Sequence, residues 1–150
     1  SRPLMPDIGH ARLHLEQATC ELLAGDGWDA YVKPFRSIED LHVLAAVTAW
    51  LYGVGLDSGW PQSLLLRLSS LLAGCAEQAQ QCPRAAASHV LLGGLFAQFD
   101  GLQTELAAAF AAGPADWAAL WQRDHNLLNI AAGARAKRLD KALQALHLAH

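Results

Sequence analysis

The hydrophobic pattern is most continuous between Arg84 and Asp100, where fifteen consecutive residues carry no charge. Apolar side chains fall on every face of a helix drawn through this stretch, so no face of that helix requires water. A helix of this kind is typical of the centre of a bundle. We therefore predict that residues 84–100 form a central helix, around which the other elements pack.

The N-terminal part of the chain carries one helical stripe. Apolar residues recur at alternating steps of three and four between residues 7 and 24, and they are Ile8, Ala11, Leu15, Ala18 and Leu22. Gly25 and Gly27 follow this stripe, and glycine readily adopts the left-handed conformation that closes a helix. The pattern predicts an amphipathic helix over about residues 7–24.

A capping signature marks the start of the next helix. The Ser37 hydroxyl can accept a hydrogen bond from a backbone amide, and the acidic residues Glu39 and Asp40 follow it. This helix is expected to reach about Tyr52, where a glycine-rich turn begins that continues to Gly59.

Proline and glycine divide the second half of the chain. Further helices are expected over about residues 61–82, 115–130 and 135–147, and Gly101 leaves open whether residues 84–112 form one helix or two. No alternating run of β-branched residues indicates a strand. The sequence therefore predicts an all-α fold, a single-domain helical bundle of five to seven helices over residues 1–150. Residues 1–6 are expected to be disordered or foreign to the natural chain.

Composition adds a surplus of apolar side chains to this picture. Hydrophobic residues make up 53% of the chain and charged residues only 17%, where about a quarter is usual. Such a chain either buries an unusually large share of its residues or leaves an apolar patch for a partner to cover. We expect self-association as a homo-oligomer or binding to a protein partner.

Net charge argues against nucleic acid as the main ligand. The chain carries a charge of −3, whereas nucleic-acid-binding proteins usually have a basic excess. Four cations gather near the C-terminus, namely Arg135, Lys137, Arg138 and Lys141. We interpret them as the solvated face of a terminal helix.

Cysteine usage and hydropathy suggest a cytoplasmic protein. The three cysteines form no pair with metal-binding spacing and fit free thiols in a reducing compartment. No signal peptide is visible at the N-terminus. The uncharged run from Leu41 to Leu56 is sixteen residues long, which is short for a membrane span, and is interpreted as a buried core helix.

The histidines are the first candidates for chemistry. His10 and His14 share a face of the first predicted helix, but two ligands are only half of a metal site and no matching pair follows. We therefore predict no metal and no cofactor. The sequence also lacks the motifs of a nucleophilic enzyme or a phosphate-binding loop.

His89 lies in the least charged part of the chain, and a satisfied core histidine is its simplest interpretation. With Gly93 four residues later on a bundle helix, the segment resembles a histidine phosphotransfer domain, which implies exchange of a phosphoryl group through His89; Leu92 stands where that family has lysine. Arg84 and His89 together resemble the arginine and histidine signature of HEPN-type ribonucleases, in which the histidine acts as general base and the arginine contacts the phosphate.

The pair Gly93 and Gly94 is costly in mid-helix and needs a reason. We predict close approach of another helix. The alternatives are a kink in the helix and a cavity for a small apolar ligand, lined by Leu92, Phe96 and a tryptophan. Tryptophans at positions 117 and 121 share a helix face and are interpreted as core.

The segment from Gly27 to Arg36 mixes aromatic and cationic residues and is interrupted by Pro34. We predict an ordered loop there. If it is exposed, Trp28, Tyr31 and Phe35 are the type of residues that make interface hot spots.

These observations favour a non-enzymatic protein–protein interaction module that uses an apolar helical surface. A regulator, an adaptor, a chaperone-like protein or an immunity-type protein would fit. The candidate binding residues are His89, Gly93, Gly94, Phe96, Trp28, Tyr31 and Phe35. A bundle that binds a small molecule near Gly93 and Gly94 is the main alternative. Neither nucleic acid nor a membrane is favoured as a partner.

Overall fold

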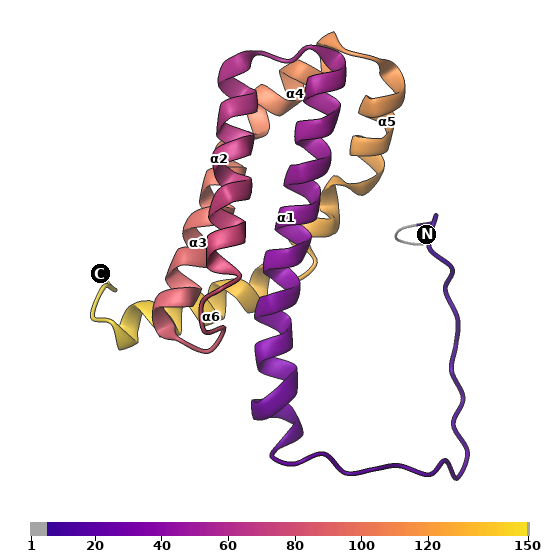
Figure 1. Ribbon diagram of the computed structural model, residues 1–150, viewed down its shortest axis with the longest axis vertical. Coiled ribbons are helices and arrows are strands. Elements are labelled where there is room, and N and C mark those ends of the chain that lie inside the picture. Colours follow the sequence, from indigo (N-terminus) through magenta and orange to yellow (C-terminus); the bar gives the residue numbers. More distant parts are fainter. Residues whose placement is uncertain (1–5, 150) are drawn as a thin grey trace.

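The computed structural model describes residues 6–149, and these residues form helices and no strand. The predicted all-helical bundle is confirmed (Figure 1). The elements in chain order are η1 (Gly27–Val32), α1 (Lys33–Ser58), α2 (Gln62–Gln78), α3 (Ala86–Asp100), α4 (Gln103–Ala112), α5 (Ala115–Asp124), η2 (His125–Asn129) and α6 (Ala132–Ala145).

The long helices α1 and α2 lie side by side, α3 packs against α2, and α6 packs against α3. In Figure 1, α6 crosses the lower ends of α2 and α3, while α4 and α5 lie at the upper end of the bundle. The lower end of α1 projects beyond α6. Residues from segments that are distant in sequence, namely the start of α1, the start of α3 and α6, line one open groove in this part of the bundle.

The start of α1 differs from the sequence prediction. Asp26 caps η1 by accepting hydrogen bonds from the backbone amides of Trp28 and Asp29 at 3.0 and 2.8 Å, and η1 runs directly into α1. Pro34 lies in the first turn of α1, directly after the residues of η1. The predicted loop is therefore helical. Ser37 caps nothing, because it lies inside the helix, buried.

The end of α1 differs as well, because the helix continues through the predicted glycine-rich turn to Ser58. Gly59 closes it with a φ of 65°. A Cβ atom on Gly55 would lie 2.7 Å from Cε3 of Trp60. Gly55 is therefore present for close packing against that ring rather than for a turn.

The core follows the facing sides of α1 and α2 and ends in an aromatic cluster. Leucines of these two helices are fully buried, namely Leu44, Leu51, Leu64, Leu68 and Leu71. Trp50 contacts Phe110, Trp117 and Trp121, with ring centroids 6.0–6.2 Å apart. The interpretation as a core residue is confirmed for Trp121, whereas Trp117 is partly buried and packs against the core.

The segment Gly27–Ser58 is long and apolar enough to cross a membrane by length and composition alone, with 33% of its most apolar window buried inside the bundle. Core helices of water-soluble bundles commonly meet the same criteria. In this chain Leu41, Leu44 and Leu51 of α1 belong to the core, whereas Leu56 is exposed, so the helix predicted as buried from Leu41 to Leu56 is buried on one side only.

The predicted central helix, α3, lies between α2 and α6. Leu92, Leu95, Phe96 and Phe99 are buried, but Leu91 and Gly94 are exposed, so α3 is not covered on every face. Helix α3 ends at Asp100 and α4 begins at Gln103, so residues 84–112 contain two helices rather than one. The expected helix over residues 115–130 ends at Asp124 and continues as the 3-10 turn η2.

The predicted helix over residues 7–24 is wrong. This segment has no regular secondary structure and is exposed along its length. Its apolar stripe contacts no complementary surface, and isolated helices of this length are marginal because tertiary packing supplies most of their stability. The expectation for residues 1–6 lies outside the described residues, except for Pro6, which is exposed in a turn.

Candidate functional site

An open groove with a volume of about 740 Å³ lies where η1, α1, α3 and α6 meet. Cations dominate its lining: Lys33, Arg36, Arg84, Lys137, Arg138 and Lys141. Asp29 is the acidic residue of the lining, which therefore has a net formal charge of +5. We call this feature the basic groove. It contains six of the chain's eleven lysine and arginine residues, although the chain as a whole is acidic.

The basic groove is assembled by tertiary packing. On α6, Lys137 and Lys141 are four residues apart and therefore share one face of the helix. Lys33 and Arg36 come from the first turns of α1. Arg84 precedes α3, and its guanidinium donates a hydrogen bond to the carbonyl of Ala30 at 3.1 Å, which ties this connection to η1.

The groove cations differ in how they are compensated. Lys33 is paired with Asp29, and Arg138 is paired with Asp40. Arg36, Lys137 and Lys141 are exposed and form no hydrogen bond or ion pair with any residue between 6 and 149. Three like charges around one groove repel one another, and an anionic ligand relieves that repulsion.

Small apolar residues line the groove between these cations. The alanines of the lining are Ala86, Ala134, Ala142 and Ala145. Trp28 stands at one side with 58% of its surface exposed, and Nζ of Lys33 lies 6.0 Å from the centroid of its ring. The groove lining therefore combines alanine side chains with cations.

A buried charge cluster fixes α6 beside the groove. Asp40 of α1 is 7% exposed, forms an ion pair with Arg138, and lies 3.6 Å from Arg135. The Arg135 guanidinium also stacks over the ring of Phe96 at 3.8 Å. Burial raises the pKa of Asp40, and the two guanidinium groups oppose that shift. Desolvation of a buried carboxylate thus outweighs the attraction of its partners.

His89 lies at the junction of the basic groove and two smaller cavities. It is half-buried. Burial, together with the positive charge of Arg138, lowers the pKa of His89, so its imidazole is neutral at neutral pH. It therefore offers one hydrogen-bond donor and one acceptor, but no charge, to a ligand.

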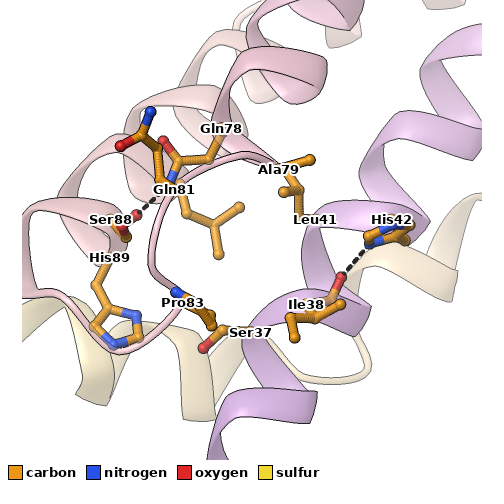
Figure 2. Close-up of a pocket in the computed structure, with 11 residues that line it drawn as sticks. Ser37, Ile38, Leu41, His42, Gln78, Ala79, Gln81, Pro83, Ser88 and His89 are labelled. Carbon is orange, nitrogen blue, oxygen red and sulfur yellow. Dashed lines mark hydrogen bonds between the residues drawn. The ribbon is translucent and has the colours of Figure 1, made fainter.

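Figure 2 shows the smaller of these two cavities, with a volume of about 140 Å³, between the start of α1 and the loop before α3. Its polar lining is mostly occupied by internal contacts. The Gln78 amide donates to the carbonyl of Ser88 at 3.4 Å, and Nδ1 of His42 lies 2.7 Å from the carbonyl oxygen of Ile38. The Ser37 hydroxyl is buried without a hydrogen-bond partner among the described residues.

The residues predicted as a binding site fall into separate places. Trp28 lines the basic groove, Gly93 and Phe96 line a cavity of about 260 Å³ between α3 and α6, and His89 lines both. Leu92 also lines that cavity, but no tryptophan does. The expected ligand pocket of leucine, phenylalanine and tryptophan is therefore not formed as predicted.

The glycine pair divides in the same way. A Cβ atom on Gly93 would lie 3.0 Å from Leu139 of α6, so the predicted close approach of another helix is confirmed at this position. A Cβ atom on Gly94 would have no neighbouring atom within 4 Å, because this glycine is exposed and faces away from α6. Only the first glycine is required by packing.

Two predicted aromatic anchors lie outside the groove. The Tyr31 hydroxyl donates a hydrogen bond to the carbonyl of Ala24 at 2.7 Å, and Phe35 is exposed. Sequence reasoning missed the groove cations themselves. The cluster near the C-terminus was visible, but its convergence with Arg36 and Arg84 depends on the packing of α6 across the bundle.

Residues 6–149 contain no group of three or more histidine, cysteine, aspartate or glutamate residues that could hold a metal ion. His14 lies 3.7 Å from Glu16 on the exposed N-terminal segment. Cys20, Cys75 and Cys82 are free thiols. Comparisons of the chain with protein families, with curated proteins and with solved structures gave no significant match.

Proposed function

We propose that this chain is a cytoplasmic, non-enzymatic interaction module whose basic groove binds an acidic amphipathic helix of a protein partner. The observation that carries this proposal is the combination of three cations without a partner among residues 6–149, namely Arg36, Lys137 and Lys141, with the alanines of the groove lining. A helix with one apolar stripe and acidic flanks matches both parts of that lining.

The small alanine side chains of the groove lining favour a helical partner over a partner with a flat surface. Alanine side chains leave room for the larger leucine or isoleucine side chains of a partner's stripe to approach the backbone of α6. Trp28, exposed at the rim, is the type of residue that contributes most to binding when a partner covers it. The cations then add selectivity for acidic flanks and accelerate association.

Nucleic acid is the less favoured anionic ligand. The chain has a net charge of −3, and Trp28 is the single aromatic residue in the groove lining, whereas single-stranded nucleic acids are usually held by several stacked aromatic side chains. The alanine side chains of the lining provide neither a charge nor a hydrogen-bond donor for a phosphate backbone.

Binding of a labelled peptide tests the proposal. The probe is an amphipathic helix of about 18 residues with a leucine stripe flanked by glutamates, and the control is a scrambled peptide of the same composition. Fluorescence anisotropy should show saturable binding of the first peptide only. The affinity should fall with added salt, because exposed charges are screened.

A matched pair of variants locates the binding surface. Lys141→Glu should weaken peptide binding about tenfold or more, equivalent to about 1.4 kcal/mol, whereas Arg67→Glu, which changes the net charge equally but lies outside the groove on α2, should leave it within about twofold. Equal effects of both substitutions, or tighter binding of single-stranded RNA that displaces the peptide, would refute the proposed partner class.

One observation favours a second candidate function. Arg84 and His89, the two residues that resemble the ribonuclease signature, line the same open groove. A cleaving enzyme would use the neutral imidazole of His89 as general base. Incubation with RNA tests this directly: cleavage that is lost in His89→Ala supports it, and intact RNA after incubation with the unmodified protein excludes it.

A further inference from the structure

The N-terminal segment, residues 7–24, exposes large apolar side chains that a folded chain ordinarily buries. Leu22 is 98% exposed and Leu15 is 66% exposed, and both belong to the stripe that would line one face of a helix. The segment is joined to the bundle at its two ends. Asp7 pairs with Arg123 of α5 at 2.7 Å, and the Ala24 carbonyl accepts the hydrogen bond from Tyr31.

This segment has the chemistry that the basic groove requires. It contains three acidic residues, Asp7, Glu16 and Glu21, and one basic residue, Arg12, for a net charge of −2. At about 100° per residue, Glu16 and Glu21 fall on opposite sides of the apolar stripe. As a helix, its 18 residues would measure about 27 Å, comparable to the roughly 21 Å of α6, which forms one wall of the groove.

We propose that two copies of the chain exchange their N-terminal segments, each segment forming a helix in the basic groove of the other copy. This inference rests on the proposed function of the groove and names a second copy of this chain as the partner. Ordering of an exposed segment into a helix on a complementary surface is a common form of coupled folding and binding.

The direction of the segment favours a second copy over its own groove. From η1 the segment leaves the lower end of α1 and rises on the side of α5, away from α6 (Figure 1). The cap formed by Asp26 and the bond from Tyr31 to Ala24 hold this exit direction. Reciprocal exchange between two copies buries both segments and closes the assembly with twofold symmetry.

Sedimentation velocity over a range of protein concentrations tests the exchange in the full chain. The unmodified protein should form a dimer, and Leu15→Asp combined with Leu22→Asp should leave a monomer. Both side chains are exposed in the single chain, so the bundle itself should stay folded. Leu13→Asp is the matched control, because Leu13 falls on the opposite face of the helix and should leave the dimer intact.

Complementation between defective copies identifies the two contacting surfaces. The variant with Lys137→Glu and Lys141→Glu should be monomeric, as should the variant with Leu15→Asp and Leu22→Asp. A mixture of the two should form a heterodimer, because one supplies an intact groove and the other an intact segment. In a single chain, Glu16→Lys and Glu21→Lys should restore dimerisation to the variant with the reversed groove charges.

The outcomes separate this inference from the proposed function. The exchange is overturned by a monomer at every concentration, or by a dimer that persists with the substitutions in the segment and with those in the groove. If the external acidic peptide still binds in the same samples, the proposed function stands. A dimer that depends on both surfaces, together with failure of the external peptide to bind the open groove of the Leu15→Asp and Leu22→Asp monomer, would support the exchange and refute an external acidic partner.

Discussion

The guanidinium of Arg138 on α6 is hydrogen-bonded to the buried carboxylate of Asp40 on α1. This contact joins two helices that are 98 residues apart at these positions, and it lies directly behind the basic groove. Because Arg138 also lines the groove and acts on His89, it links the stability of the fold to the properties of the candidate site.

We expect Arg138→Gln to lower the free energy of unfolding by about 2 kcal/mol, because the buried carboxylate of Asp40 loses a charge-assisted hydrogen bond. Urea denaturation followed by circular dichroism measures this change. Lys137→Gln is the control, since Lys137 is exposed and has no ion pair within the described part of the chain, and its effect should remain within about 0.5 kcal/mol. Similar effects of the two substitutions would contradict the assigned role of the ion pair.

The pKa of His89 should lie below its ordinary value of about 6.5. The folded chain then binds this proton less tightly than the unfolded chain. Between the lower pKa of the folded state and the higher pKa of the unfolded state, the free energy of unfolding therefore rises with pH, and acidification lowers it. Arg138→Gln should raise the pKa of His89, because the substitution removes a nearby positive charge. An NMR titration of the imidazole signals measures the pKa of His89 in the unmodified protein and in the variant.

An acidic partner in the groove should raise the pKa of His89 and therefore bind more tightly as the pH falls through the same interval. Peptide affinity measured across this pH range should show the trend in the unmodified protein and lose it in His89→Gln. An identical pH dependence in the two proteins would place the titrating group elsewhere.

Two glycines of α1 should respond in opposite ways to alanine. Gly53→Ala should stabilise the protein by about 1 kcal/mol, because alanine favours a helix and no atom lies within 4 Å of the added Cβ. Gly55→Ala should destabilise it by about 1–3 kcal/mol, because the added methyl group would overlap the buried ring of Trp60. Thermal unfolding of the two variants decides whether the contact is as close as described.

The glycine pair of α3 offers a functional comparison. Gly93→Leu should displace Leu139 and with it α6, separating the groove cations and weakening binding of the acidic peptide about tenfold or more. Gly94→Leu should leave the peptide affinity unchanged, because that position faces away from α6. Equal binding by both variants would show that the position of α6 does not control the groove.

Local features of the sequence were sufficient for the class of fold and for much of its division into helices. The end of α2 before Pro83 and the packing of Trp117 and Trp121 on the core follow from residue spacing and from proline, whereas Gly101 left open whether residues 84–112 form one helix or two. These signals depend on only a few neighbouring residues, so helix positions and ends can be predicted from them without knowledge of the rest of the chain.

Other features depended on which surfaces are available for packing. The stripe from Ile8 to Leu22 predicts a helix, yet in the single chain nothing covers it, and it remains extended. Ser37 has the side chain of a helix cap, but Pro34 and η1 extend the helix past it. The stripe lacks the tertiary packing that supplies most of a helix's stability, whereas at Ser37 a capping preference of about 1 kcal/mol yields to the continuation of the helix.

The sequence by itself determined that the chain would be helical, rich in apolar residues and weakly acidic. Only the tertiary structure decided that six of its cations would gather in one groove, because Lys33, Arg84 and Lys141 are brought together by the crossing of α6 over the start of α3. Charge in a sequence is a sum over residues, whereas a binding site depends on where packing places each one.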